Sequence, residues 1–257
     1  MDLTRRSFAL ASAACLLGPR AASAALQDAA LTIPYRALTS EPFPVHAIDL
    51  SRIKPEFLRR EVREGEIGSR EPPGTIVVDP AKHFLYLVLH DGKAMRYGVG
   101  VGRSGFAWSG DATINSKQAW PDWYPPKEMF ERQPQLRRAM RKMRLGLGMP
   151  GGAGNPLGAR ALYLWQDNRD TLFRIHGTIE PWTIGSNVSS GCIRMINQDV
   201  IDLYERVEPG ARVAVLGSSG SIVASDHAHG AISSSDGVPP LHHLVRDPAA
   251  LASRGLW

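Results

Sequence analysis

The chain contains 257 residues and carries a formal net charge of +5 at pH 7. That length fits one domain with flanking segments, and the small basic excess does not argue for nucleic acid as a partner. Cys15 and Cys192 are the only two cysteines. No zinc-type cysteine pairing, RNP-type aromatic run or phosphate-binding glycine loop occurs, which excludes the commonest metal and nucleotide motifs.

The first 24 residues have the pattern of an export signal. Arg5 and Arg6 precede an apolar stretch from Phe8 to Leu17, and Ala22-Ser23-Ala24 supplies small residues of the cleavage type. The apolar stretch is shorter than the about 20 residues that a membrane-spanning helix needs, and no later stretch is longer. The paired arginines favour the twin-arginine route over general secretion. A lipid-modified Cys15 is disfavoured, because the leucine expected three residues before it is missing. We therefore expect a periplasmic protein with no stable membrane span.

Residues 25–72 are interpreted as an N-terminal extension that packs on the following domain or tethers it. Within it, the run from Ser51 to Arg60 can form a helix, and nothing in the extension indicates chemistry. A mainly β domain is predicted over residues 73–216, because β-branched and apolar runs alternate there with turn signals. The predicted strands lie at residues 75–78, 84–89, 94–101, 112–115, 161–164, 171–176 and 212–216.

Two helices are predicted inside this domain. Residues 127–143 carry apolar residues at helical spacing, although Pro134 must break or start a segment there. The second helix is expected to be capped by Asn197-Gln198-Asp199 and to end at Pro209-Gly210. Residues 217–257 are rich in Gly, Ser, Ala, His and Pro, and we expect a low-complexity, flexible tail. Its histidines are interpreted as solvated: His227, His229, His242 and His243.

Two further clusters each allow two interpretations. The basic residues between positions 132 and 144 can attract an anionic wall polymer, but a solvated helix face is favoured. The second cluster is aromatic and comprises Trp120, Trp123, Tyr124 and Trp182. These side chains can line a substrate groove or pack inside the domain, and the sequence favours neither.

His176 and Cys192 are the residues whose pairing indicates chemistry. Cys192 would be the only thiol left after removal of residues 1–24, and an unpaired thiol in an oxidising compartment needs a reason. The thiolate is the reactive form of cysteine, and a histidine within hydrogen-bond reach generates it at neutral pH. His176 ends a predicted strand, sharing a face with Leu172 and Arg174, and Cys192 follows a polar loop. The two side chains can therefore meet across a cleft as base and nucleophile for acyl transfer.

The loop before Cys192 can supply backbone donors for an oxyanion. The peptide N–H groups around Gly191 and Cys192 can stabilise the oxyanion that forms on attack, and Gly191 leaves room for the carbonyl. The simpler alternative is a satisfied polar histidine and a small buried cysteine without a chemical role. The residues around the pair favour the catalytic alternative.

The run from His176 to Gly185, followed by Ser189-Ser190-Gly191-Cys192-Ile193-Arg194-Met195 and Asn197, closely resembles the catalytic motif of YkuD-type L,D-transpeptidases. The resemblance covers roughly residues 75–216 and includes the loop from Pro150 to Gly158, which is typical of that family. A single cysteine or histidine is a weak signal, whereas the whole string is highly specific.

This resemblance implies an exported enzyme of the bacterial cell wall with a β-sandwich-like catalytic domain. The family's cysteine attacks the bond between the third residue of a tetrapeptide stem, often meso-diaminopimelate, and the terminal D-alanine. An acyl-enzyme forms, D-alanine leaves, and an amine on a second stem or on a wall-anchored protein takes the acyl group. Carried onto this chain, Cys192 is the nucleophile and His176 the general base and later the acid. The carbonyl of Gly177 then orients the imidazole.

The remaining predicted site residues surround the nucleophile. Arg194 aligns with the family's arginine and either binds a substrate carboxylate as a planar fork or ties the loop to the domain. Ser189, Ser190, Gly191 and Trp182 complete the predicted substrate and oxyanion set. Ser190 departs from the family pattern, since many members have histidine there. The departure leaves His176 as the base and puts in doubt any role that depends on a second imidazole.

The sequence therefore predicts an exported L,D-transpeptidase whose partners are peptidoglycan stem peptides, a tetrapeptide donor and an amine acceptor. No metal or organic cofactor is expected, because no His/Asp/Glu cluster has metal-ligand spacing and the cysteine supplies the nucleophile. One alternative is an L,D-carboxypeptidase or endopeptidase, which forms the same acyl-enzyme and passes it to water. A second alternative is a catalytically silent module that binds the cell wall.

Overall fold

The computed structural model describes residues 33–103, 108–125, 127–132, 134–142, 148–189 and 191–217. The predicted export signal, Ser190 and all but the first residue of the predicted tail lie outside these ranges. Within the described ranges, every helix is too short or too polar to cross a lipid bilayer.

The fold is mainly β, as predicted, and is built on one nine-stranded sheet. Its strands, in their order across the sheet, are β1 (Arg60–Arg63), β4 (Lys93–Gly98), β3 (Phe84–Val88), β2 (Ile76–Asp79), β11 (Arg212–Val215), β6 (Gly110–Ala119), β7 (Arg160–Gln166), β8 (Arg169–His176) and β10 (Ile193–Arg194). Two neighbouring pairs are parallel, β2 with β11 and β8 with β10, and the others are antiparallel. A separate small sheet joins β5 (Val101–Gly102) to β9 (Asn187–Ser189).

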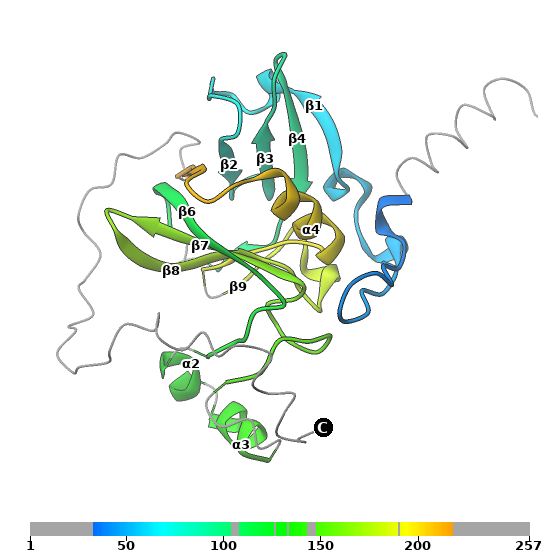
Figure 1. The fold of residues 1–257 in the computed structure, drawn as a ribbon, viewed down its shortest axis with the longest axis vertical. Coiled ribbons are helices and arrows are strands. Elements are labelled where there is room, and N and C mark those ends of the chain that lie inside the picture. Colours follow the sequence, from blue (N-terminus) through cyan, green and yellow to red (C-terminus); the bar gives the residue numbers. More distant parts are fainter. Residues whose placement is uncertain are drawn as a thin grey trace, which may run out of the picture. The chain divides into compact units, whose positions relative to one another are not determined.

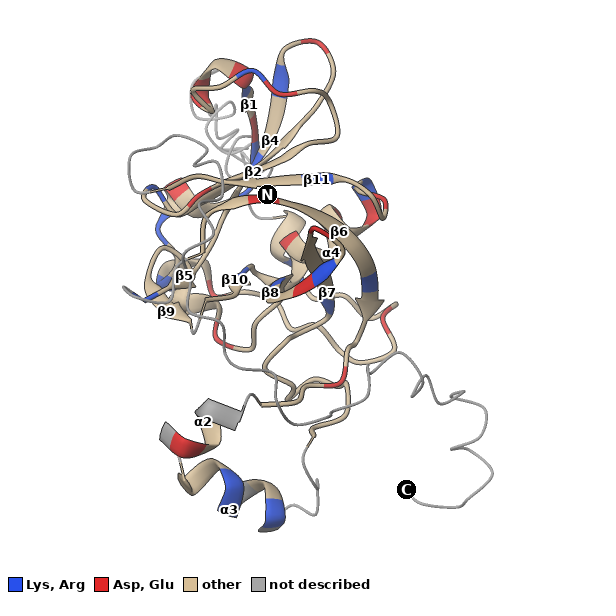
Figure 2. Ribbon diagram, turned by 90° about the vertical axis from the view of Figure 1, so that its left-hand side faces the viewer, with Lys and Arg blue, Asp and Glu red and all other residues tan. Residues whose placement is uncertain are grey.

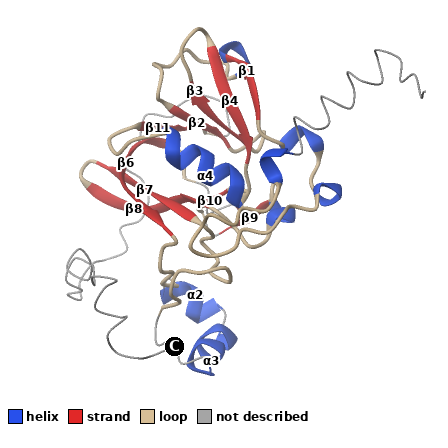
Figure 3. Cartoon of the chain, turned by 45° about the vertical axis from the view of Figure 1, so that its right-hand side comes forward, coloured by secondary structure: helices blue, strands red, loops and turns tan. Residues whose placement is uncertain are grey.

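Helix α4 (Asn197–Arg206) fills the space between the two halves of this sheet. Figures 1 and 3 show it between the strands β2, β3 and β4 on one side and β6, β7 and β8 on the other. Val200 and Leu203 of α4 are fully buried in the main core cluster. That cluster also takes Ile76 and Leu85 from one half of the sheet and Leu162 from the other. Burial of this continuous apolar surface is the main stabilising contribution to the fold.

The strand predictions are confirmed, with two differences. The run predicted at 94–101 is divided, because β4 ends at Gly98 and β5 starts at Val101. The strand β1 comes from the segment interpreted as an extension and pairs with β4 at the edge of the sheet. Its burial pattern leaves only Val62 buried, which explains why no strand was recognisable there.

The helix allowed at 51–60 is absent from the described structure of that run. Two short 3-10 turns occur instead, η2 (Leu50–Arg52) and η3 (Pro55–Phe57). Pro55 has no N–H to continue a helix, and it holds the preceding Lys54 in an extended conformation with φ −63° and ψ 132°. Further 3-10 turns are η1 (Ile33–Tyr35), η4 (Glu64–Glu66) and η5 (Pro181–Thr183).

The predicted helix at 127–143 is present as two pieces, α2 (Lys127–Arg132) and α3 (Pro134–Lys142). Pro134 starts the second piece, as expected for a residue that fits the first helical position. Met140 is buried, whereas Arg137, Arg138 and Arg141 are exposed. Figure 2 shows the blue of Lys and Arg on α3. Exposure fits a solvated face and an anion-attracting face equally well, so both interpretations stay open.

The predicted cap of α4 is wrong in detail. The N-cap residue is Ile196, and no side chain caps the helix there. Asn197 is the first helical residue, and its amide bonds to two loops of the domain instead. Gln198 donates from Nε2 to the carbonyls of Arg36 and His46, at 3.1 and 2.9 Å. The start of α4 thus holds the N-terminal segment rather than its own backbone.

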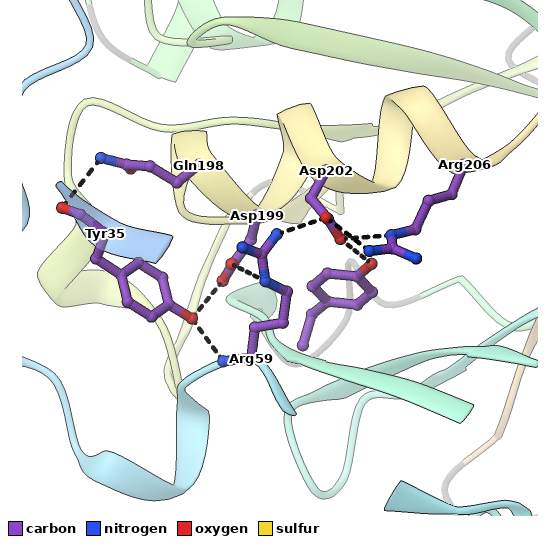
Figure 4. A network of polar contacts seen from close by, with 7 residues as sticks. Tyr35, Arg59, Gln198, Asp199, Asp202 and Arg206 are labelled. Carbon is purple, nitrogen blue, oxygen red and sulfur yellow. Dashed lines mark hydrogen bonds and ion pairs between the residues drawn. The ribbon is translucent and has the colours of Figure 1, made fainter. Parts of the chain in front are cut away.

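A buried polar network joins the N-terminal segment to α4 (Figure 4). Tyr35 donates from its hydroxyl to Asp199, at 3.2 Å, and accepts the backbone N–H of Arg59 at 2.5 Å. The Arg59 guanidinium lies 3.0 Å from Asp202 and 3.7 Å from Asp199. Asp202 also accepts from Tyr97 of β4 at 2.7 Å. Residues 33–72, the described part of the segment interpreted as an extension, therefore pack against the domain.

Asp199 makes this network sensitive to pH. Burial raises the pKa of Asp199 from 3.8 to about 7, against the opposing charge of Arg59. The native state therefore binds a proton that the unfolded state releases between these two values. This proton's contribution to the free energy of unfolding is complete below pH 3.8 and is lost as the pH rises through about 7. We expect the melting temperature of the wild type, relative to Asp199→Asn, to fall between pH 5 and pH 8. A constant difference in thermal unfolding would contradict the assignment.

Candidate active site

The parallel pair of β8 and β10 brings the two predicted catalytic residues together. Ile193 pairs with Ile175 and Arg194 with His176, so Cys192 stands beside Arg174. Paired residues of neighbouring strands point to the same face, and alternate residues of one strand share a face. Because Ile175 and Ile193 point into the core, Cys192 and His176 share the opposite face. The prediction that the two side chains can meet agrees with this placement.

The predicted shared face of Leu172, Arg174 and His176 needs one correction. Leu172 has φ +62° and is 72% exposed, and the β7–β8 ladder shifts register between Tyr163 and Trp165. The irregularity ends the regular alternation before Arg174. Of the three residues, only Arg174 and His176 therefore share one face of the strand as predicted.

His176 is held by the backbone around it. Its side chain is buried, with 5% exposure, and Nδ1 lies 2.5 Å from the carbonyl oxygen of Gly177. A carbonyl can only accept, so this contact places a proton on Nδ1 and leaves Nε2 as the acceptor nitrogen. Burial lowers the pKa of His176 from 6.5 to about 4, and the positive charges of Arg194 and Arg174 lower it further against the Gly177 bond. The imidazole is therefore neutral at physiological pH.

Cys192 is partly exposed and is a free thiol. Burial of the sulfur raises the pKa of Cys192, and this effect exceeds the opposing backbone hydrogen bond from Arg174 and the charges of Arg174 and Arg194. The resting pair is consequently an uncharged thiol beside an uncharged imidazole. This differs from the thiolate expected from the sequence, because burial disfavours the charged form of both groups.

The loop before the nucleophile uses one of the two predicted oxyanion donors internally. The N–H of Gly191 donates to the Ser189 hydroxyl at 3.1 Å, and that hydroxyl donates to the Cys192 carbonyl at 2.5 Å. Gly191 has φ +122°, a conformation that favours glycine. Ser189 therefore shapes the loop, and the N–H of Cys192 remains as the candidate oxyanion donor.

Arg194 forms an ion pair with Glu180 at 3.0 Å, between β10 and the loop that follows His176. Of the two roles expected for Arg194, this contact corresponds to the one in which the guanidinium ties a loop to the domain. The guanidinium stays on the Cys192 face of the sheet, where its charge bears on both pKa values. Glu180 gives no sequence signal of its own, because a single loop carboxylate has no recognisable pattern.

Asn197 joins the two loops beside the base. Its Oδ1 accepts the N–H of Ala159 at 3.0 Å, and its Nδ2 donates to the carbonyl of Thr178 at 3.1 Å. A Cβ atom at Gly158 or Gly177 would collide with Asn197 Oδ1, so the amide packs directly on these backbones. The amide therefore contacts both Gly177 and Thr178, the two residues that flank the peptide of the Gly177 carbonyl. We infer that Asn197 positions His176 through this backbone.

We expect Asn197→Ala to lower the rate at which a carbapenem acylates Cys192 by about 10- to 100-fold, because the orienting carbonyl loses its support. Asn197→Asp keeps the acceptor for Ala159 but loses the donor to Thr178, and an intermediate rate is expected. Stopped-flow acylation and the NMR pKa of His176 check this. Loss of melting temperature with unchanged rate and pKa would contradict a positioning role.

The aromatic cluster does not form one surface. Trp120 and Trp182 line the same cavity, whereas Trp123 pairs with Met149 in an isolated bridge and Tyr124 is 62% exposed. Among the residues that the structure describes, no group of three or more His, Cys, Asp or Glu side chains could hold a metal ion. Ser190 is the one predicted site residue that falls outside the described ranges.

Comparison with protein families identifies the family of this chain. The model of the YkuD family, described as an L,D-transpeptidase catalytic domain, matches residues 73–215. The chain belongs to the YkuD family of L,D-transpeptidase catalytic domains. The resemblance inferred from the motif around Cys192 is thereby confirmed.

Individual relatives are similar over parts of the chain. "Probable L,D-transpeptidase ErfK/SrfK" of Escherichia coli K12 is 34% identical over 146 residues, 55% of this chain and 43% of its own length. "Putative L,D-transpeptidase YkuD" of Bacillus subtilis is 47% identical over 62 residues, 24% of this chain and 35% of its own. The match thus spans less than half of these curated relatives.

Two solved structures are also similar. A Brucella melitensis protein named a probable carnitine operon oxidoreductase is 50% identical over 65% of this chain and 99% of its own, with a TM-score of 0.42. An L,D-transpeptidase from Mycobacterium smegmatis is 16% identical over 56% of this chain and 59% of its own, also with a TM-score of 0.42.

Proposed function

We propose that this protein is an L,D-transpeptidase that acts on peptidoglycan stem peptides through a cysteine acyl-enzyme. The observation that carries the proposal is the parallel pairing of β8 with β10, in which His176 ends β8 and Cys192 directly precedes β10. Membership of the YkuD family supports the class of substrate. In this proposal the domain over residues 73–216 carries the chemistry, and residues 25–72 support it.

The reaction follows from the protonation states of the pair. As the sulfur of Cys192 attacks the diaminoacyl carbonyl, its proton passes to Nε2 of His176, and the negative charge moves to the carbonyl oxygen. The N–H of Cys192 stabilises that oxyanion. On collapse, the bond to D-alanine breaks, and His176 returns the proton to the leaving amine. An acceptor amine then attacks the thioester, and the released sulfur regains a proton.

The other site residues support these steps. Gly177 holds the Nδ1 tautomer, Ser189 and Gly191 shape the loop, and Arg194 keeps the Glu180 loop in place while its charge favours the developing thiolate. Ser190 and Trp182 stay assigned to the substrate surface. Neither a metal nor an organic cofactor is required, because the thiol is the nucleophile and the imidazole moves the proton. We further propose export to the periplasm, with the twin-arginine route favoured over general secretion.

The neutral pair predicts an unusual pH profile. We expect the acylation rate with a carbapenem to stay level from pH 8 to about pH 5 and to fall as His176 becomes protonated near its pKa of about 4. A stopped-flow experiment with a brief pH jump measures the rate before unfolding intervenes. An acid limb centred near 6.5, the ordinary histidine value, would show that the imidazole is not buried as described.

Product analysis tests the proposed function. The purified protein is incubated with a defined tetrapeptide stem, and the products are identified by mass spectrometry. Cross-linked dimers with release of D-alanine support transfer. Tripeptides alone indicate water as the acceptor and an L,D-carboxypeptidase. No turnover, no carbapenem adduct and tight binding to sacculi would overturn the enzyme proposal in favour of a wall-binding module.

A further inference from the structure

A cavity of about 270 Å³ lies between the N-terminal segment and the loop that follows His176. One wall is the continuous stretch from Pro44 to Asp49 together with Arg52, and the opposite wall runs from Thr178 to Trp182. Neither His176 nor Cys192 lines it. The first wall lies outside residues 73–215, the range that the family model matches.

The lining combines aromatic rings with planar polar groups. Trp182 is 46% exposed, and the Arg52 guanidinium covers its ring at 4.4 Å from the centroid. Trp120 contributes a second indole, whose Nε1 donates a hydrogen bond of 3.0 Å to Glu41. Stacking between Arg52 and Trp182 orders both side chains before any ligand arrives.

The polar groups on the rim are available to a ligand. Both hydrogen bonds that Asp49 accepts from Ser51 end on Oδ1, at 3.1 and 2.6 Å. Its Oδ2 has no side-chain partner within the described ranges, and Arg52 forms no ion pair there. The rim thus offers an acceptor and a planar donor of opposite charge. Such a pair suits a neutral ligand rich in hydroxyl and amide groups better than an anion or a cation alone.

The walls are held in place by contacts described above. Gln198 donates to the carbonyls of Arg36 and His46, which fixes the N-terminal wall against α4. Asn197 fixes Thr178 on the opposite wall. The cavity is therefore preformed, and its second wall begins two residues after His176.

We propose that this cavity binds an N-acetylated sugar ring of the glycan strand to which the stem peptide is attached. This inference rests on the proposed function. The indole of Trp182 suits the apolar C–H face of a pyranose ring, and Asp49 and Arg52 suit its hydroxyl and N-acetyl groups. A volume of about 270 Å³ lies just below the about 300–1,000 Å³ of typical ligand sites, which fits one ring rather than a chain. The cavity selects glycan-linked stems over free peptides.

The test compares two donors, a free tetrapeptide and the same tetrapeptide on its N-acetylglucosaminyl-N-acetylmuramyl disaccharide. We expect the wild type to have at least about tenfold higher kcat/KM for the disaccharide form. Arg52→Ala should remove that advantage through KM and leave the free tetrapeptide within about twofold, since Arg52 lines the cavity and has no role in the proposed reaction itself. Tyr124→Ala is the matched control, since this exposed aromatic residue lies outside the cavity, and it should change neither substrate. Equal kcat/KM for both donors in the wild type, or equal loss on both in Arg52→Ala, overturns the proposal.

A binding measurement separates this inference from the proposed function. Titration of the stem-free disaccharide into the Cys192→Ala protein is followed by tryptophan fluorescence, with and without Trp182→Ala and Arg52→Ala. Saturable binding that either cavity substitution weakens by about tenfold supports the sugar site even if no donor is turned over. Absent binding overturns the sugar site, whereas turnover of the free tetrapeptide would still support the transpeptidase.

Discussion

Cys192→Ser is expected to abolish transfer, with kcat/KM for a tetrapeptide stem reduced by at least about 1,000-fold. The hydroxyl of serine is far harder to ionise than a thiol, and the surrounding burial already opposes the charged form of residue 192. His176, with its pKa near 4, is too weak a base to compensate. Release of D-alanine, measured with the purified variant, checks the loss.

The Cys192→Ser protein should keep its fold, because the substitution is nearly isosteric and the Ser189 contact uses the Cys192 carbonyl rather than its side chain. An unchanged melting temperature is the control that separates loss of chemistry from loss of structure. Retention of most of the activity in a folded variant would show that another residue is the nucleophile.

His176→Ala is expected to lower the rate of acylation by about 100- to 10,000-fold at pH 7, the range of general base catalysis. Without the imidazole, only the ionised thiol reacts, and burial raises the pKa of that thiol. The variant's rate should therefore climb steeply with pH, while the wild type stays level. Acylation by a carbapenem, followed from pH 6 to pH 10, measures both the loss and the changed slope.

His90→Ala serves as the matched control, because His90 is an exposed residue at the turn before β4. Its acylation rate should equal that of the wild type throughout the pH range. A His176→Ala protein that keeps the level profile of the wild type would exclude this imidazole as the base.

Much of the fold was predictable because its strands are short apolar runs bounded by turn residues. Runs such as Ile76–Asp79 are buried on both faces and therefore read as continuous apolar segments. The edge strand Arg60–Arg63 was not recognisable, since one buried valine among charged residues gives no period. Its identity depends on pairing with β4, and that partner is set by tertiary structure alone.

The proposed pair of His176 and Cys192 could be named from the sequence because both residues lie in one compact motif that ends at Arg194. The protonation state could not be predicted, since burial depends on the packing of α4 and both sheet halves around the site. Asn197 shows the same limit. Its position suggested a helix cap, but its amide bonds to Ala159 and Thr178, which only the fold brings near.

The N-terminal segment was the least predictable part. Tyr35 and Arg59 show no pattern in the sequence, yet both enter the buried network on α4. Pro44 and Arg52 likewise form a cavity wall only because the segment packs against the loop after His176. Contacts between positions more than a hundred residues apart leave no local signal.

The site at which a carbapenem modifies the protein covalently is the most direct measurement of whether Cys192 is the nucleophile. Cys192 and Cys15 are the only cysteines in the sequence, so the adduct can be assigned without ambiguity. Intact-protein mass spectrometry followed by peptide mapping should find one adduct per chain, on the peptide that contains Cys192, and none in Cys192→Ser. An adduct on another residue, or none on a folded wild-type protein, would contradict a nucleophilic Cys192 activated by His176.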